Sequence, residues 1–457
     1  MARVLATRAA VLAAVLGLAA TAAPASRAFA VMADAERLAL KPTWPGFDAR
    51  AVPVALYDGH DTWLFRHPRP PAGFAPVPER ESVFRYAGLH PELRANTSAE
   101  LGGVKTAAVM LDSQPRASDA ELAAVVMHEA FHVFQASHHA DWTANEAELF
   151  IYPADDAAIL ALVRLETEAL RRSLAAKRGE TAAAWAATAV ALRRDRYSRL
   201  AEGARGYERG LELKEGLAQY VQDLALGRLP LSRSGGDAGA EDVRQRTYAS
   251  GQALALILDR LAPAWRTTLE AGPTTPLDEI LAAELDRRHV AAAAFKEREL
   301  AAARDRANAE VERLAAHRAT LRSSFQAQPG WTLVVVAADS KPLWPQGFDP
   351  LQIRRLGPRD LLHKRWLKLG NDAGAIEILG HQAITQAAGA NALLDGLRTL
   401  NVAGLDATVV AEAADGGVTI TGGGVAASFH PARVERSDRR VLVSLGGAPS
   451  HRTTRRP

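Results

Sequence analysis

Short apolar runs separated by turn dipeptides mark the first third of the chain. Residues 52–57 and 62–65 carry two such runs and flank Asp58-Gly59, a dipeptide typical of tight hairpin turns. Residues 105–111 form a further run of the same kind. The pattern predicts that residues 31–117 are rich in β-strands.

The run at 105–111 follows Gly102-Gly103 and leads towards the next predicted element, a helix. Two successive glycines allow another backbone to approach closely, as a substrate-binding edge strand requires. The same pair also suits a simple turn before a core strand. Both interpretations stay open from the sequence alone.

Over residues 118–287 the apolar positions recur at helical spacing. Ser118 and Glu121 fit a capping box, and the apolar surface that follows predicts a deeply buried helix ending near Ser137. Residues 157–202 keep helical spacing with a break near Gly179, which predicts a helical hairpin. Further helices are predicted over 207–227 and 241–261, and another with Thr275 as N-cap and Pro276 as its first residue.

The pattern returns to the β type in the last third of the chain. Residues 288–326 are rich in alanine and charge, which predicts one long, largely solvated helix at a domain boundary. Residues 330–447 carry short apolar runs with frequent glycines and predict a smaller, mostly β C-terminal domain. The polar tail 448–457 is predicted to be disordered. The chain is therefore expected to have an α+β fold.

Composition limits the classes of partner and of metal site. The net charge is +3, from 55 basic and 52 acidic residues, which is too balanced to favour nucleic acid or an anionic membrane as a partner. The chain contains no cysteine. Disulfides and thiolate ligands are therefore excluded, and a metal site must be built from histidines and carboxylates.

Residues 1–30 have the pattern of a cleavable signal peptide. Arg3 and Arg8 precede an uncharged apolar run, and Ala28-Phe29-Ala30 is an A-x-A cleavage sequence, so that Val31 would begin the mature chain. A membrane anchor is the alternative, but the apolar run is shorter than the ~20 residues that span a bilayer. The sequence predicts export to the periplasm or the extracellular space, with no later membrane span.

The predicted buried helix contains His128-Glu129-Ala130-Phe131-His132, an H-E-x-x-H sequence. Residues four apart on a helix lie about 40° apart around its axis, so His128 and His132 can reach one point. That geometry suits two ligands of a catalytic zinc ion. Glu129 lies about 100° round the helix from His128 and can act as general base towards a metal-bound water.

A third ligand is expected on the later helix over 207–227. Glu208, Glu212 and Glu215 are spaced i, i+4 and i+7, within about 60° of arc, so all three can face the same direction. Gly216 favours Glu215, because a glycine permits close helix approach. Glu212 remains the alternative ligand, and a solvated acidic face explains any glutamate that binds no metal.

The H-E-x-x-H sequence and the later Glu215-Gly216-Leu217-Ala218-x-Tyr220 together resemble the gluzincin metallopeptidases. That group includes thermolysin-like and aminopeptidase-like enzymes. The resemblance covers about residues 100–265 and implies a zincin-like catalytic region. His132 and Glu215 are 83 positions apart, so the predicted hairpin would be an insertion. The G-x-M-E-N sequence that binds a substrate's amino terminus is absent, so aminopeptidase specificity is not implied.

The resemblance also implies roles for individual residues. His128, His132 and Glu215 would hold Zn²⁺, with water in the fourth position, and Tyr248 would stabilise the oxyanion. Gln219 would orient a ligand histidine by accepting its imidazole N–H. We expect the remaining acidic and histidine candidates to be surface residues, namely His138, His139, Glu166 and Glu168.

The favoured function is therefore that of an exported zinc metallopeptidase acting on peptides or proteins. One alternative is an envelope binding or chaperone-like protein that keeps the zinc fold with little turnover. The intact Glu129 argues against it, since a non-catalytic site needs no general base. Another alternative is a zinc hydrolase of a non-peptide amide or ester.

Overall fold

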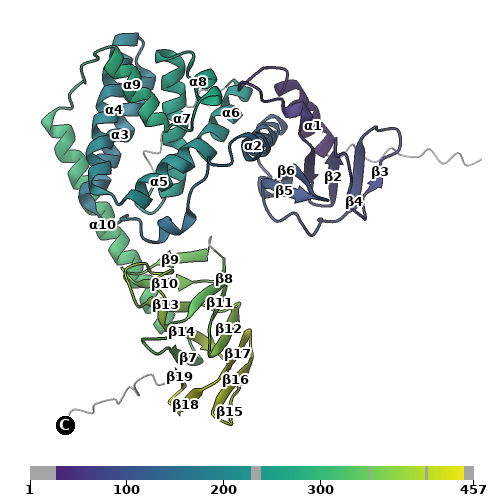
Figure 1. Cartoon of the computed structure of the whole chain (residues 1–457), viewed down its shortest axis with the longest axis vertical. Helices are drawn as coiled ribbons and strands as arrows, with labels where there is room; N and C mark the ends of the chain where they lie inside the picture. The colour runs from purple at the N-terminus through teal and green to yellow at the C-terminus, as the bar shows by residue number, and fades with distance from the viewer. Residues whose placement is uncertain (1–26, 228–237, 350–351, 407–409, 447–457) are drawn as a thin grey trace, which may run out of the picture. The chain divides into compact units, whose positions relative to one another are not determined.

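The structure is a computed structural model that describes residues 27–227, 238–349, 352–406 and 410–446 (Figure 1). Most of the predicted signal peptide and the predicted disordered tail lie outside these residues. The chain divides into two compact units, residues 1–42 with 48–133 and residues 43–47 with 134–457. The boundary near residue 133 falls within one continuous helix, α2 (Asp119–His138).

A six-stranded sheet with the order β3-β4-β2-β1-β6-β5 forms most of the first unit. The predicted hairpin is confirmed: the Asp58 carboxylate accepts hydrogen bonds from the backbone N–H groups of His60 and Asp61, and Gly59 has a φ of +96°. The elements are α1 (Arg27–Leu38), η1 (Ala49–Ala51), β1 (Val54–Tyr57), β2 (Asp61–Phe65), β3 (Ala75–Pro76), β4 (Val83–Ala87), β5 (Thr97–Leu101), β6 (Val104–Met110) and η2 (Leu111–Ser113).

Gly102 and Gly103 form the turn between β5 and β6, with φ values of +53° and +73°. β6 pairs with β1 on its other side, so it is an interior strand of the sheet. The edge-strand interpretation of residues 105–111 is therefore wrong, and the simple turn is correct. The glycines are required there by the left-handed backbone conformation.

Helix α2 begins at the predicted capping box. The Ser118 N–H and hydroxyl both donate to a Glu121 carboxylate oxygen at 2.9 Å, and the Ser118 hydroxyl accepts from the Glu121 N–H. The helix ends at His138, one residue beyond the expected end at Ser137. Most of its residues between 122 and 135 are buried, as a rigid platform for a site requires.

The predicted hairpin of helices is confirmed as α3 (Ala157–Ala175) and α4 (Gly179–Arg199), which pack along each other (Figure 1). The helix expected over 207–227 is not one regular helix, because a π-helical segment, η4, interrupts it. The other elements of this region are η3 (Glu146–Phe150), α5 (Glu202–Leu211), η4 (Glu212–Gly216), α6 (Leu217–Leu226), α7 (Val243–Leu261), α8 (Trp265–Ala271) and α9 (Leu277–Arg287). The N-cap of α9 is Pro276 and not the expected Thr275.

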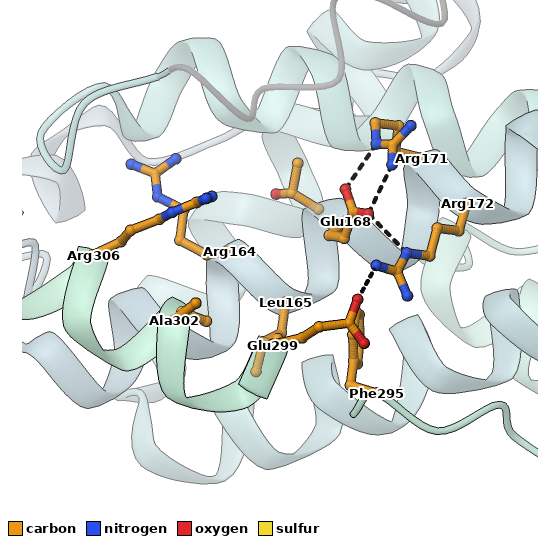
Figure 2. Close-up of a pocket in the computed structure, with 11 residues that line it drawn as sticks. Arg164, Leu165, Glu168, Arg171, Arg172, Phe295, Glu299, Ala302 and Arg306 are labelled. Carbon is orange, nitrogen blue, oxygen red and sulfur yellow. Dashed lines mark hydrogen bonds and ion pairs between the residues drawn. The ribbon is translucent and has the colours of Figure 1, made fainter. Parts of the chain in front are cut away.

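The long charged helix is shorter and less solvated than expected. α10 spans Glu297–Gln326, and residues 290–296 before it are not helical. One face packs on α3, where Arg172 of α3 bonds Glu299 of α10 at 2.5 Å. A cavity of about 320 Å³ lies between the two helices, and Figure 2 shows ion pairs crossing one end of it. Alanines at 303 and 307 let α10 approach, so the alanine-rich composition serves packing.

The C-terminal region is a sandwich of two β-sheets, and the expected α+β class is confirmed. Apolar side chains of both sheets, such as Val335, Ile376 and Leu400, form one buried core between them. The strands are β7 (Trp331–Val336), β8 (Trp344–Phe348), β9 (Ile353–Arg355), β10 (Asp360–His363), β11 (Trp366–Asn371), β12 (Gly374–Leu379), β13 (Ala383–Ala387), β14 (Leu397–Leu405), β15 (Val410–Ala414), β16 (Gly417–Gly422), β17 (Val425–Phe429), β18 (Ala432–Ser437) and β19 (Arg440–Leu445).

Among the described residues, none of the helices combines the length and the apolar composition that crossing a bilayer requires.

Candidate metal centre

His128 and His132 lie one turn apart on the buried part of α2. Their side chains are mostly enclosed, with 8% and 9% of each residue exposed. The two Nε2 atoms are 3.1 Å apart. Two ligands of one tetrahedral zinc ion, each at ~2.05 Å, are separated by roughly 3.3 Å. The observed spacing therefore fits two imidazole lone pairs directed at a common cation.

Gln135, one turn after His132, fixes α2 against the π-helical segment. Its side-chain amide donates to the backbone carbonyls of Leu213 at 3.0 Å and Lys214 at 2.9 Å. A π-helical turn disturbs the regular backbone hydrogen bonds, so its carbonyls can accept from outside the helix. This buried glutamine holds the backbone immediately before Glu215, and it was not among the predicted site residues. Its one sequence signal is a polar amide in an apolar stretch of the motif helix.

The third predicted ligand lies with the two histidines. One ligand atom from each of His128, His132 and Glu215 can be chosen so that all three lie within 4.8 Å of one another. Glu215 is buried, with 5% of the residue exposed. Two imidazole nitrogens and one carboxylate oxygen are a donor set that catalytic zinc sites use. The residues present therefore fit zinc.

The π-helical segment separates the three glutamates that regular helical spacing places on one face. Glu212 is fully buried, and its two carboxylate oxygens accept from the guanidinium of Arg193 at 2.8 and 2.7 Å. The hydroxyl of Ser250 also donates to Glu212. Glu212 is thus engaged by a cation from α4, which argues against it as the alternative metal ligand.

Glu208 belongs to the same buried group of charges. Arg196 donates to Glu208 at 2.7 Å and to Glu166 at 2.8 Å, and Arg193 also bonds Glu166. The expectation that Glu166 is a surface charge is wrong, because only 4% of the residue is exposed. Glu168, two residues on, is partly exposed and pairs with arginines of its own helix. We call Glu166, Arg193, Arg196, Glu208 and Glu212 the buried charge network.

Glu208 and Glu212 have pKa values that are shifted in opposite directions. Burial alone would raise the pKa of Glu208, but the charges of Arg196 and Arg246 outweigh burial and hold it at about 2. For Glu212, burial outweighs the attraction of Arg193, and its pKa is raised. The network ties α3, α4 and α5 to the first residue of η4, the segment that carries Glu215.

Helix α7 places Tyr248 and Arg244 beside Glu215. One guanidinium nitrogen of Arg244 lies 3.1 Å from a Glu215 carboxylate oxygen and 3.1 Å from the Tyr248 hydroxyl. Arg244 also pairs with Glu146. Burial, together with the charge of Glu215 and a hydrogen bond to it, raises the pKa of Tyr248, so the phenol keeps its proton. Tyr248 was a predicted site residue. Arg244, one turn earlier on the same helix, was missed.

A glycine pair allows α7 to approach the π-helical segment closely. A Cβ atom added to Gly216 would lie 2.7 Å from the Cα of Gly251, closer than side chains are found in proteins. A Cβ added to Gly251 would lie 2.9 Å from the Cα atoms of Glu212 and Gly216. The expected role of Gly216 in close helix approach is confirmed, and its partner is Gly251.

Gln219 donates its side-chain amide to Asp223 at 3.3 Å, and Gln252 of α7 donates to the same buried carboxylate. The orienting role proposed for Gln219 towards a ligand histidine stays a prediction. Asp223 was not identified from the sequence, where it is one of many acidic residues at helical spacing.

The two histidines after the motif differ from each other. His138 is exposed, as expected, and stacks on Phe134 with a ring separation of 4.2 Å. His139 is not a surface residue: its Nε2 lies 3.0 Å from Glu270, and its ring stacks on Trp142 at 3.8 Å. His139 therefore helps to pack the end of α2.

Comparisons of the chain with protein-family models, with curated proteins and with solved structures found no match.

Proposed function

We propose that this protein is an exported, gluzincin-like zinc metallopeptidase. The single observation that carries the proposal is that ligand atoms of His128, His132 and Glu215 lie within 4.8 Å of one another. His132 and Glu215 are 83 positions apart in the sequence, so regular helix geometry cannot account for the meeting of Glu215 with the two histidines. The pattern of residues 1–30 supports export.

The donor set favours zinc over harder cations. Ca²⁺ and Mg²⁺ prefer six or more oxygen ligands, whereas this cluster offers two imidazole nitrogens and one carboxylate. Three protein ligands leave the position that catalytic zinc sites keep for water or substrate. Zinc bound there would act as a Lewis acid and would make a water molecule acidic enough to lose its proton near neutral pH.

Glu129 is the residue proposed to move protons. It is buried, with 6% of the residue exposed, and follows the ligand His128 directly on α2. Its carboxylate would accept the proton of the attacking water and then deliver it to the nitrogen of the leaving amine. A mostly buried carboxylate is suited to both steps, because little water reaches it to compete for the proton.

Tyr248 and Arg244 are proposed to stabilise the negative charge that develops on the carbonyl oxygen. The phenol remains protonated, so it can donate a hydrogen bond. Arg244 adds a permanent positive charge 3.1 Å from the same hydroxyl. Removing one such donor typically costs about 100-fold or more in kcat.

Hydrolysis of an unstructured protein such as casein tests the proposal. We expect wild type to cleave it, Glu129→Gln to lose at least about 1,000-fold in kcat with zinc still bound, and Tyr248→Phe to lose about 100-fold. His138→Gln is the matched control, since it changes an exposed histidine of the same helix. Wild-type cleavage that survives in Glu129→Gln would overturn the mechanism. Zinc binding without hydrolysis across a broad peptide library would favour the binding-protein alternative.

A further inference from the structure

The π-helical segment η4 carries Glu215, the third proposed metal ligand. Single π turns are rare within helices and occur mostly at functional sites. A protein that keeps such a turn must supply contacts that favour it over an ordinary α-helical turn. The contacts that do so here determine where the Glu215 carboxylate lies.

The backbone of η4 departs from the α-helical pattern at the carbonyl of Leu213. In an α-helix the N–H of Leu217 would donate to that carbonyl, four residues earlier. In this structure the Leu217 N–H is directed instead to the carbonyls of Glu212 and Lys214. The bond to Glu212 spans five residues, as in a π turn. The Leu213 carbonyl therefore loses its α-helical donor.

Gln135 of α2 supplies a donor in its place. Its side-chain amide donates to the Leu213 carbonyl at 3.0 Å and to the Lys214 carbonyl at 2.9 Å. Gln135 and Leu213 are each only 3% exposed, so water cannot readily replace either partner. A buried carbonyl that lacks a donor is costly, so this amide stabilises the π form over the α form.

Gln135 lies on the face of α2 that carries the two histidine ligands. It follows His128 by seven residues, which places it about 20° from His128 around the helix axis. One face of one helix therefore presents two metal ligands and the amide that holds the backbone of the third.

The other contacts of η4 are of a different kind. Arg193 bonds the side chain of Glu212, and Gly251 packs against the Cα atoms of Glu212 and Gly216. Gln135 instead bonds main-chain carbonyls, and it is the main-chain hydrogen bonds that differ between an α turn and a π turn.

We propose that Gln135 is a positioning residue of the metal centre: its amide keeps Glu212–Gly216 in the π form, and that form sets the carboxylate of Glu215 with His128 and His132. Without the amide, the Leu213 carbonyl regains a backbone donor if the Leu217 N–H returns to it, as in an α-helix, and Glu215 is displaced by that change. This role of Gln135 rests on the proposed zinc centre but not on peptidase activity.

Zinc affinity of the full chain, measured by competition with a chelator, tests this role independently of catalysis. Gln135→Met keeps the length of the side chain and removes the donor. We expect it to lower zinc affinity at least about tenfold, because the third ligand is no longer held in place. The visible absorption spectrum of the Co²⁺-loaded variant should also differ from that of wild type, since the spectrum reports the ligands and their geometry.

Ser173→Ala is the matched control for the loss of a buried hydrogen bond. The Ser173 hydroxyl donates to the Ala182 carbonyl at 2.8 Å, between α3 and α4, and the residue is fully buried. Both variants should lower the urea midpoint of the zinc-free chain. Only Gln135→Met should lower zinc affinity. Gln135→Asn, whose amide is one methylene shorter, carries the test if Gln135→Met does not fold, and it should also bind zinc more weakly than wild type.

Wild-type zinc affinity and a wild-type Co²⁺ spectrum in the folded Gln135 variant would overturn the positioning role while leaving the metal centre intact. An equal loss of zinc affinity in Ser173→Ala would also overturn it, because reduced stability alone would then explain the loss. Absence of zinc binding in wild type would overturn the metal centre itself, and the role of Gln135 with it.

Discussion

Three glutamates within eight residues have three different sets of partners, and those partners decide what each carboxylate can do. Arg196 and Tyr152 bond Glu208, and Arg193 and Ser250 bond Glu212. Glu215 accepts a hydrogen bond from the guanidinium of Arg244, which also bonds the Tyr248 hydroxyl. Glu208 and Glu212 therefore pair inside the fold, whereas Glu215 is the glutamate that lies with His128 and His132.

Replacing Glu208 by glutamine removes the negative charge between Arg196 and Arg246. We expect the free energy of unfolding at pH 7 to fall by roughly 3–5 kcal/mol, because two buried cations lose a counter-charge. Urea denaturation measures the loss. Glu168→Gln, which breaks a partly exposed pair, is the control and should cost about 1 kcal/mol or less.

The same variant should change the response to acid. The pKa of Glu208 is about 2 in the folded state, against 4.5 as its ordinary value. Its stabilisation is therefore present above pH 4.5 and is lost as the pH falls towards 2. Glu212, whose pKa is raised, acts in the opposite sense. The unfolding free energy of Glu208→Gln should thus decline less steeply below pH 4.5, and an identical slope would contradict the assignment.

Gly251→Ala tests the close crossing of α7 and η4. The added methyl group would lie 2.9 Å from the Cα atoms of Glu212 and Gly216, so the segment that carries Glu215 must move. We expect a loss of about 2 kcal/mol in the free energy of unfolding and a zinc affinity at least about tenfold lower.

Gly206→Ala is the matched control, since a Cβ at Gly206 has nothing within 4 Å and α5 is a regular helix there. That change should stabilise the protein by about 0.5–1 kcal/mol and leave zinc affinity unchanged. Wild-type zinc affinity in Gly251→Ala would show that the crossing does not position Glu215.

At the scale of elements, the π-helical segment accounts for most of what the sequence could not predict about the site. Regular spacing kept Glu208, Glu212 and Glu215 equivalent, because it assumes 3.6 residues per turn throughout. The wider π turn at Glu212–Gly216 depends on long-range partners, among them Gln135, Arg193 and Gly251. Local features, such as the Ser118 cap and the Asp58-Gly59 turn, were predictable because their hydrogen bonds are local.

Helix α1 constrains where a signal peptide can be removed. Ala28 and Val31 are fully buried, and the ring of Phe29 packs edge-on against Trp63 at 4.9 Å. Arg27 bonds Asp119, at the start of α2, at 2.8 Å. The predicted cleavage after Ala30 would remove the first turn of this packed helix.

A second A-x-A sequence, Ala23-Pro24-Ala25, lies five residues upstream of the first. Cleavage after Ala25 would keep the whole of α1, so the proposed export predicts a mature chain that begins at Ser26. Intact mass and N-terminal sequencing of the secreted protein identify the first residue of the mature chain. A mature chain that begins at Val31 would refute this expectation.

At the scale of the whole molecule, the succession of elements was predictable apart from helix α1, and the long-range contacts of the elements were not. Periodicity indicated the β-rich start, the helical hairpin and the C-terminal β domain, because each of them depends on the spacing of apolar residues within one continuous segment. The burial of Glu166 and the packing of His139 were missed, since their partners Arg193 and Glu270 lie 27 and 131 positions away in the sequence.

The central claim is that His128, His132 and Glu215 together hold one zinc ion. Metal content by mass spectrometry of the purified full chain tests it most directly, in wild type and in Glu215→Gln, with His138→Gln, an exposed histidine of α2, as the control. We predict about one zinc per chain in wild type and in His138→Gln, and a loss of at least about tenfold in zinc affinity in Glu215→Gln. Full zinc occupancy in Glu215→Gln, or no zinc in wild type, would contradict the account.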